Sequence, residues 1–507
     1  MTPPLPPDGR GTTADDAGPA TRDPRSMWRW RPVRHSVATA GAALAGAVLA
    51  VLVAQPAEVL PRLAGPVRAV VFVGGAWLVF AAGGWLVRRL PVRTATVLIV
   101  LGGAALPLAA ASAPPRSSDD MYRYIWDGRV QAAGIDAYRY VPAAPELAGQ
   151  RDDFLWPPRA TWCVPAGAVD PDHGRPLTPG CTLINRPAVH TVYPPVAQAL
   201  FWATQQLSPP HSRERPLQLV MTAFALATTI LLLVGLRSGG ADPRLAVLWA
   251  WCPTVALEAG NNAHVDVVAV FVTGLALLVL ARAGTRRATA LGGVLLGLAV
   301  ATKLTPILVA PAVLRRRPVL VAAATAGAVA VVYLPHLAVV GARAIGYLPG
   351  YLNEEGYLTG PRFALLTLVL PDAWAGPAAV AVLAAVALLT ARTAQPDRPW
   401  LAATTMTGAA LIVAAPSYPW YALLLLLLVA LSGRTEWLAV AFAGYLAQYA
   451  AGVHLATGTA QRIGYGAALI AVMVAAIRRR RATISPPAPP VRHCGSSSSR
   501  PGARRCS

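Results

Sequence analysis

Charged residues are scarce in this sequence, and their absence from long stretches excludes a soluble globular protein. Of the 507 residues, 13% are charged and 55% are hydrophobic, and many runs of about 15 to 25 residues contain no charge. A hydrocarbon core about 30 Å thick needs roughly 20 such residues per helix. The sequence therefore predicts an all-α polytopic membrane protein.

Acidic residues are also in the minority, with 23 against 44 basic residues and a formal net charge of +21. Such a charge could indicate a nucleic-acid partner. The basic residues, however, cluster at the ends of apolar runs and in the tails, as at 29–35, 286–287, 315–317 and 478–481. This is the positive-inside pattern of membrane proteins, so the charge indicates topology and no nucleic-acid partner.

Lysine is almost absent, because 43 of the 44 basic residues are arginine and the exception is Lys303. A bias of this kind usually reflects nucleotide composition. The single lysine then either occurs by chance or occupies a position that needs a compact ammonium group instead of a planar guanidinium. Asparagine is scarce as well, yet Asn261 and Asn262 are adjacent.

A phosphate-binding glycine loop is missing too, and no soluble segment is large enough for a nucleotide fold. Both absences argue against a cytoplasmic nucleotide-sugar or ATP as the substrate. An activated substrate would have to come from the bilayer.

Cysteine occurs five times, twice in one long polar loop, at Cys163 and Cys181. If that loop faces an oxidising compartment, these two residues are expected to form a disulfide. Cys252 lies in a predicted span, and Cys494 and Cys506 lie in the C-terminal tail, where they should stay reduced.

The chain divides into a membrane domain, expected at 28–477, and two tails, 1–27 and 478–507, that we expect to be disordered and cytoplasmic. Three spans come first, and the arginines between the second and third place that loop inside. The chain should therefore emerge outside near residue 113. The long polar loop 113–192 is rich in aromatics, which argues against disorder.

About 12 to 14 crossings with both termini inside are expected. Two segments leave the count open. One is 193–216, whose apolar part is short for a span. The other is 288–314, which has arginines at both ends. A hairpin that breaks at KLTP, 303–306, would satisfy both flanks and bring Lys303 to the outer side.

The segment SSDDMYRYIWDGRVQAAG, 117–134, follows the third span and predicts a helix capped by Ser117 or Ser118 and ended by Gly134. Its polar face carries Asp120, Arg123, Tyr124 and Asp127, and its aromatic face carries Tyr122, Ile125 and Trp126. The predicted helix lies on the membrane with the aromatic face toward lipid. Its carboxylates have two interpretations, ordinary helix stabilisation or a general base.

Two further clusters are candidate site segments. EAGNNAHVDVV, 258–268, gathers polar residues at the outer end of a span, where they indicate either a site or a solvated turn. Its histidine and two carboxylates could also bind a divalent metal, although their spacing is not a specific metal signature. SYPWYALLLLLL, 417–428, carries Trp420 and Tyr421, which are site residues or interfacial belt aromatics.

A sugar transfer from a lipid phosphate fits these residues. It needs a carboxylate to take the acceptor's proton and cations to stabilise the departing phosphate. Asp120 or Asp119 is the candidate base, and Arg123 and Lys303 are the candidate phosphate partners. Direct attack assisted by a single base would invert the anomeric centre.

The order of the motifs resembles a known family. DDMYRYIWDGRVQAAGIDAYRY, INRPAVHTVYPPVAQALF, NNAHVD, GLAVATKLTPILVAP and SYPWYALLLLL look like the polytopic GT-C glycosyltransferases, especially the bacterial polyprenyl-phosphate-mannose-dependent mannosyltransferases of the GT87 type. The resemblance covers about 113–430. It implies a membrane-helix bundle with a structured first outer loop and a catalytic outer-loop aspartate at Asp120, beside Asp119.

Two departures from the family pattern concern the outer loop. Asp136, Ala137 and Tyr138 stand where the family tends to read Asn-Pro-Tyr, and 157–182, which holds both loop cysteines, looks like an insertion. Acceptor identity is therefore open between a glycolipid, a cell-wall glycan and a secreted protein. Mannose follows from the resemblance alone, because other hexoses or arabinose would need the same groups.

The resemblance and the residues together predict a multi-pass cell-membrane enzyme with an extracytoplasmic site, a polyprenyl-phosphate sugar as donor, and no evident cofactor. A transporter or lipid-linked sugar flippase is the alternative. The absence of a visible repeat and the position of the polar clusters at one face favour the enzyme. The predicted substrate-binding residues are Arg123, Tyr124, Asp127, Tyr193, Asn262, His264, Asp266, Lys303, Trp420 and Tyr421.

Overall fold

The computed structural model describes residues 24–55, 60, 63, 65–170, 174–357 and 360–484. Most of the two predicted tails, 1–23 and 485–507, lies outside these residues. The remaining tail residues are helical, since the first helix begins at Pro24 and the last ends at Ile484.

Nearly all of the regular secondary structure in the described chain is helical. The α-helices are α1 (Pro24–Ala54), α2 (Gly65–Val87), α3 (Val92–Ala110), α4 (Asp120–Ala132), α5 (Pro195–Leu207), α6 (Arg215–Ser238), α7 (Val247–Ala250), α8 (Pro253–Val255), α9 (Asp266–Arg282), α10 (Arg286–Val300), α11 (Ala310–Val313), α12 (Pro318–Val340), α13 (Leu348–Glu354), α14 (Asp372–Thr393), α15 (Trp400–Ala414), α16 (Leu423–Ser432), α17 (Leu438–Gln448) and α18 (Thr457–Ile484).

Short 3-10 helices connect them, and one connection, η3 (Ala256–Asn261), is a π-helix. The 3-10 helices are η1 (Pro145–Gln150), η2 (Pro243–Ala246), η4 (Thr305–Val309), η5 (Gly341–Ile345), η6 (Leu366–Leu368), η7 (Pro419–Ala422), η8 (Thr435–Trp437) and η9 (Ala450–Val453). Two short strands, β1 (Trp162–Val164) and β2 (Gly180–Thr182), pair antiparallel in the outer loop.

The predicted all-α polytopic fold is confirmed. Seven helices in the described residues are long and apolar enough to cross a membrane, and up to eight if the bent pair Pro253–Asn261 and Asp266–Arg282 counts as one span. This number is below the predicted 12 to 14 crossings because several predicted spans fold as shorter helices. Trp400–Ala414 and Pro419–Ser432, for example, are apolar but short.

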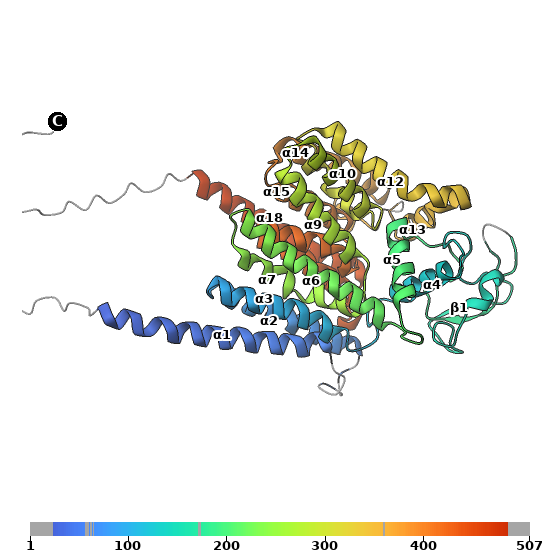
Figure 1. The fold of residues 1–507 in the computed structure, drawn as a ribbon, viewed down its shortest axis with the longest axis horizontal. Helices are drawn as coiled ribbons and strands as arrows, with labels where there is room; N and C mark the ends of the chain where they lie inside the picture. The colour runs from blue at the N-terminus through green and yellow to red at the C-terminus, as the bar shows by residue number, and fades with distance from the viewer. Residues whose placement is uncertain are drawn as a thin grey trace, which may run out of the picture.

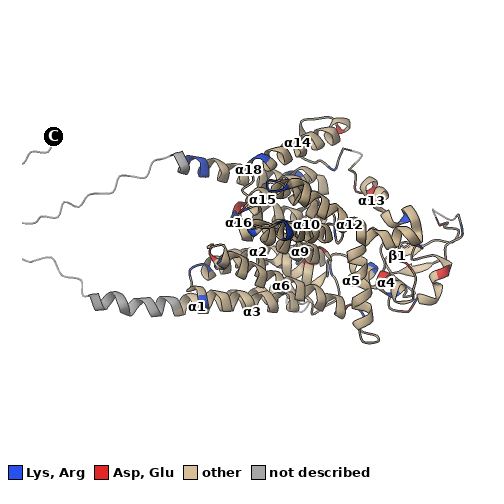
Figure 2. Ribbon diagram, turned by 45° about the horizontal axis from the view of Figure 1, so that its top comes forward, with Lys and Arg blue, Asp and Glu red and all other residues tan. Residues whose placement is uncertain are grey.

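The bundle has two distinct ends (Figure 1). The outer-loop elements α4 and β1 lie at one end, together with α5 and α13. The start of α1 and the end of α18 lie at the other end. Figure 2 shows basic residues at that end of α18, where the sequence carries Arg478–Arg481.

The centre of the bundle is α16, whose residues Leu423–Leu428 are fully buried. It contacts α6, α7, α9 and α15. A helix that is apolar on every side belongs in such a position. By contrast, α12 and α14 expose large apolar side chains such as Val319 and Val380. These helices at the periphery of the bundle present a surface suited to lipid hydrocarbon.

The turn that carries NNAHVD lies inside the protein and not in solvent. The segments Pro253–Asn261 and α9 meet at an angle of 120°. Gly260 packs on the end of α3 so closely that a Cβ atom there would lie 2.3 Å from the Pro107 carbonyl oxygen. The solvated-turn interpretation is therefore wrong, because these polar groups are held by α3 and the residues after it.

The first outer-loop helix, α4, begins at Asp120, whose N–H donates to the Ser118 hydroxyl at 3.3 Å. The prediction that its aromatic face meets lipid is wrong. Ile125 and Trp126 of that face are buried, because the outer loop and α5 cover the helix. The Tyr124 ring stacks on Phe201 of α5 at 4.4 Å.

The contact between α4 and α5 depends on a glycine. A Cβ atom at Gly128 would lie 2.5 Å from the Phe201 carbonyl oxygen, so Gly128→Ala must push the two helices apart. We expect a cost of about 1–3 kcal/mol, measured as a lower thermal unfolding temperature of the purified protein in detergent. Gly149→Ala is the matched control, since a Cβ atom there meets nothing within 4 Å. Equal unfolding temperatures for the two variants would contradict this account.

Candidate functional site

A cavity of about 370 Å³ lies where the loop 113–192 meets the helix bundle. It is formed by residues that are far apart in the sequence and come from six regions. These are the start of α4, the strand β1, the loop segment 185–194, the turn 303–305, the segment 347–357 with α13, and the SYPWY segment at 417–421. Its polar and aromatic lining includes Asp119, Asp120, Arg123, Trp162, Asn185, Arg186, Tyr193, Lys303, Tyr351, Tyr418, Trp420 and Tyr421.

Two adjacent carboxylates face this cavity and differ in their hydrogen bonds. The Asn185 amide donates to Asp119 Oδ1 at 2.9 Å and to Asp120 Oδ1 at 2.7 Å. The Trp162 indole N–H donates to the other oxygen of Asp119. Asp119 is thus held at both oxygens, whereas Asp120 Oδ2 has His264 Nδ1 as its neighbour at 3.7 Å. Asp120 is the carboxylate better placed to accept a proton.

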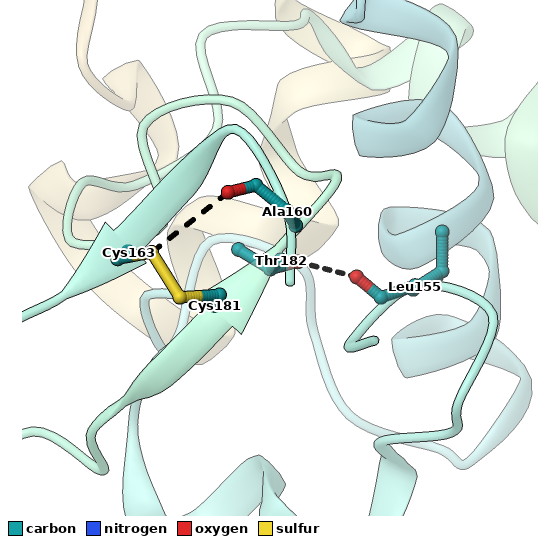
Figure 3. The surroundings of a disulfide bond; sticks show 5 residues. All are labelled: Leu155, Ala160, Cys163, Cys181 and Thr182. Atoms are coloured by element: carbon teal, nitrogen blue, oxygen red, sulfur yellow. Dashed lines mark hydrogen bonds between the residues drawn. A yellow bond between two sulfur atoms is a disulfide. The ribbon is translucent and has the colours of Figure 1, made fainter. Parts of the chain in front are cut away.

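A disulfide-closed hairpin brings Trp162 to the site. β1 and β2 pair Cys163 with Cys181, and the two residues form a disulfide (Figure 3). The Thr182 hydroxyl donates to the Leu155 carbonyl oxygen at 2.6 Å and ties the hairpin to the preceding loop (Figure 3). The apparent insertion 157–182 therefore reaches the cavity wall through Trp162.

Removal of the disulfide should loosen this hairpin. The bond closes a separation of 18 residues, for which chain entropy gives about 3 kcal/mol. We expect reductant to lower the unfolding temperature of the wild type in detergent. Cys163→Ser combined with Cys181→Ser should show the same lower temperature without reductant and no further change with it. A reductant effect of equal size in this double variant would contradict the assignment.

Lys303 reaches the cavity because helix α10 ends at Val300. The chain then turns, and η4 begins at Thr305, so the break falls at KLTP. The Lys303 ammonium lies 3.1 Å from Asp266 Oδ2 and 5.3 Å from the centre of the Tyr193 ring. The lysine is thus paired with a buried carboxylate and beside an aromatic face.

Tyr193 stands between the lysine and the carboxylates. Burial, and then the nearby Asp120 carboxylate, raise the pKa of Tyr193 well above its ordinary value. The phenol therefore stays neutral at physiological pH and can serve as a hydrogen-bond donor.

Three aromatic rings of the SYPWY segment form another wall. Tyr418 stacks on Trp420 with 4.6 Å between ring centres, and Trp420 lies 6.1 Å from Tyr421. The Tyr421 and Tyr351 hydroxyls are hydrogen-bonded to each other. Flat apolar faces with polar edges suit a sugar ring or the first isoprene unit of a lipid.

Arg186 is a cation that the sequence-based site prediction did not include. Its Nε donates to Glu354 at 2.9 Å. Burial alone would lower the pKa of Arg186, but the Glu354 carboxylate outweighs burial and raises that pKa. The INRP motif contained the signal, since it holds Asn185 and Arg186 in a chain where asparagine is scarce.

Several predicted substrate-binding residues lie behind the residues that line the cavity. Asp127 is buried, where it accepts from Arg123 at 3.0 Å, from Thr191 at 2.6 Å and from Gln198 at 2.9 Å. Arg123 borders the cavity, but it also donates to the carbonyl oxygens of Arg186 and Val189. These contacts hold the loop segment 185–194 against α4.

The NNAHVD side chains likewise form a buried layer beneath the cavity. Asn262 donates to Ser117 at 2.7 Å and to Glu258 at 2.8 Å. His264 is fully buried against Trp420, and Asp266 holds Lys303. Tyr124, also predicted to bind substrate, is buried on the far side of Tyr193. Among the residues that the structure describes, no three His, Cys, Asp or Glu side chains gather as a metal site.

Comparison with known proteins gives one match. Residues 191–417 match the family model of Glycosyltransferase family 87, whereas no curated protein and no solved structure matches the chain significantly. The matched segment contains Tyr193, His264, Asp266 and Lys303, while Asp119 and Asp120 precede it. The chain is thus similar to family 87 over residues 191–417, and this similarity, together with the polytopic helical fold, supports a membrane glycosyltransferase.

Proposed function

We propose that the chain transfers a hexose, with mannose as the first candidate, from a polyprenyl phosphate to an extracytoplasmic glycolipid or cell-wall glycan. The observation that carries this proposal is one cavity lined by a carboxylate, Asp120, and an ammonium group, Lys303, from separate parts of the chain. These are the two charges that an inverting displacement at an anomeric phosphate needs.

Asp120 acts as the base. The Asn185 amide holds one of its oxygens at 2.7 Å, which orients the carboxylate, and its other oxygen accepts the proton of the acceptor hydroxyl. The acceptor oxygen bonds to the anomeric carbon from the face opposite the phosphate. The bond between that carbon and the phosphate oxygen breaks, and the configuration inverts.

The departing phosphate is stabilised by Lys303, with Arg186 as a second cation on the same cavity. Arg123, the partner expected from the sequence, is in this view a positioning residue, because Asp127 and two carbonyl oxygens occupy its guanidinium. The apolar side chains Leu304, Leu348 and Leu352 border the cavity and suit the lipid end of the donor.

The positions of the charged segments support an extracytoplasmic site in the cell membrane. The cavity lies at the end of the bundle that carries the loop 113–192, and the basic end of α18 lies at the other end (Figure 2). The positive-inside rule assigns the basic end to the cytoplasm. The cavity then opens where lipid-linked sugars are present and nucleotide-sugars are not.

The test is sugar transfer by membranes that contain the full chain. Membranes with the wild type, with Asp120→Asn and without the chain are given radiolabelled polyprenyl-phosphate mannose and a mixture of lipid and glycan acceptors. Label should enter an acceptor with the wild type alone, and GDP-mannose should not replace the donor when synthesis of the lipid-linked sugar is blocked. Absence of transfer with every polyprenyl phosphate sugar, from folded protein, would overturn the proposal in favour of a transporter.

A further inference from the structure

A histidine lies buried between two carboxylates directly behind the proposed base. His264 is fully buried, and its two ring nitrogens face different acids. Nδ1 lies 3.7 Å from Asp120 Oδ2, and Nε2 lies 3.5 Å from Glu258 Oε2. Within the part of the chain that the structure describes, neither ring nitrogen has a hydrogen-bond partner at normal distance. A buried polar side chain in this state needs an explanation.

The carboxylate on the inner side is held in place. Glu258 is fully buried and accepts from the Tyr445 hydroxyl at 2.7 Å and from the Asn262 amide at 2.8 Å. The His264 ring stacks on Trp420 with 4.0 Å between centres, so it can slide in its own plane but cannot tilt easily. A shift of about 0.6–0.8 Å would bring either nitrogen to ordinary hydrogen-bond distance.

The protonation state of the imidazole determines how many of these two carboxylates it can donate to. A neutral ring has one N–H and can donate to one carboxylate, whereas an imidazolium donates from both nitrogens. A site with an acid at each nitrogen is therefore complementary to the protonated ring. Burial opposes the protonated ring, and of the other charged groups that act on it Asp266 favours that form and Lys303 opposes it, so the ring would carry the proton only transiently.

We propose that His264 is a relay that accepts the reaction's proton from Asp120. This inference rests on the proposed function. The acceptor hydroxyl gives its proton to Asp120 Oδ2 as its oxygen bonds to the anomeric carbon and the phosphate leaves. The proton then passes to His264 Nδ1, while the N–H at Nε2 donates to Glu258. After product leaves, the proton returns through Asp120 to the cavity.

His264 acts through Asp120 and is a positioning and relay residue, so its loss should affect turnover more than binding. We expect His264→Gln to lower kcat about 10²-fold, within the range for assisted proton transfer, while the KM for the donor changes less than about twofold. His336→Gln is the matched control. His336 also pairs with an aspartate, Asp136, at 2.7 Å, but it does not border the cavity.

Chemical rescue separates a relay from a space-filling role. His264→Ala should regain activity with added imidazole and not with pyrazole, which has the same ring size and is a much weaker base. Equal rescue by both rings, or a kcat of His264→Gln within about threefold of the wild type, would overturn the relay. Full activity of Asp120→Asn would remove the base assignment and the relay with it, whereas absence of transfer from the wild type would overturn the proposed function.

Discussion

Asp120→Asn should lower kcat for sugar transfer by about 10²–10⁴-fold, the usual contribution of a general base. The amide keeps the size of the carboxylate and can still pair with Asn185, which donates to Asp120 Oδ1 at 2.7 Å in the wild type. It cannot accept the acceptor's proton. The measurement is the initial rate of label transfer from polyprenyl-phosphate mannose by purified protein in detergent or nanodiscs, with unfolding temperature measured in parallel.

Two other aspartates of the outer loop are changed for comparison with this variant. Asp152→Asn changes an outer-loop aspartate that pairs with Arg129 away from the cavity, and it should retain wild-type kcat. The kcat of Asp119→Asn should lie between those of Asp120→Asn and Asp152→Asn, because Asp119 helps to place Asn185 and Trp162. A fully active, folded Asp120→Asn protein would remove the base assignment, and a low rate only in Asp119→Asn would move it to the neighbour.

Lys303→Gln is expected to lower kcat by about 10²–10³-fold, as for removal of one donor that stabilises developing negative charge. Two effects combine, because the leaving phosphate loses a cation and Asp266, buried and 3.1 Å from the ammonium, loses its partner. The same transfer assay measures kcat, and donor binding is measured separately. Arg159→Gln, an exposed outer-loop cation that does not border the cavity, is the control for loss of charge.

Lys303→Arg tests whether the compact shape of the group matters as well as its charge. The ammonium lies between Asp266 and the Tyr193 ring, 5.3 Å from the ring centre, and a planar guanidinium needs more room there. We expect kcat at least about tenfold below the wild type and above that of Lys303→Gln. Unchanged kinetics would mean that the single lysine of this chain has no special role beyond its charge.

Much of the architecture could be predicted from local sequence patterns. Uncharged apolar runs indicated the spans, and the predicted helix at 117–134 agrees with α4 at Asp120–Ala132. The break at KLTP followed from arginines on both sides of one segment, and the chain does turn there. These features depend on residues within about 30 positions of each other, where composition and periodicity act directly.

The assignment of roles among the polar residues came only from tertiary structure. Spacing placed Asp120, Arg123, Tyr124 and Asp127 on one helical face and treated them alike. In the structure Asp120 faces the cavity, whereas Asp127 is satisfied by Thr191 and Gln198, and Tyr124 is covered by Phe201.

The same holds for the second carboxylate and the histidine. Asn185 bridges Asp119 and Asp120 from more than 60 residues away. His264 lies next to Asp120, although the two residues are more than 140 positions apart in the chain. The sequence by itself determined that this is a helical membrane protein with polar segments gathered at one face. The packing of distant segments decided which of those polar groups meet in a cavity, because contacts between residues far apart in the chain leave no periodic pattern in the sequence.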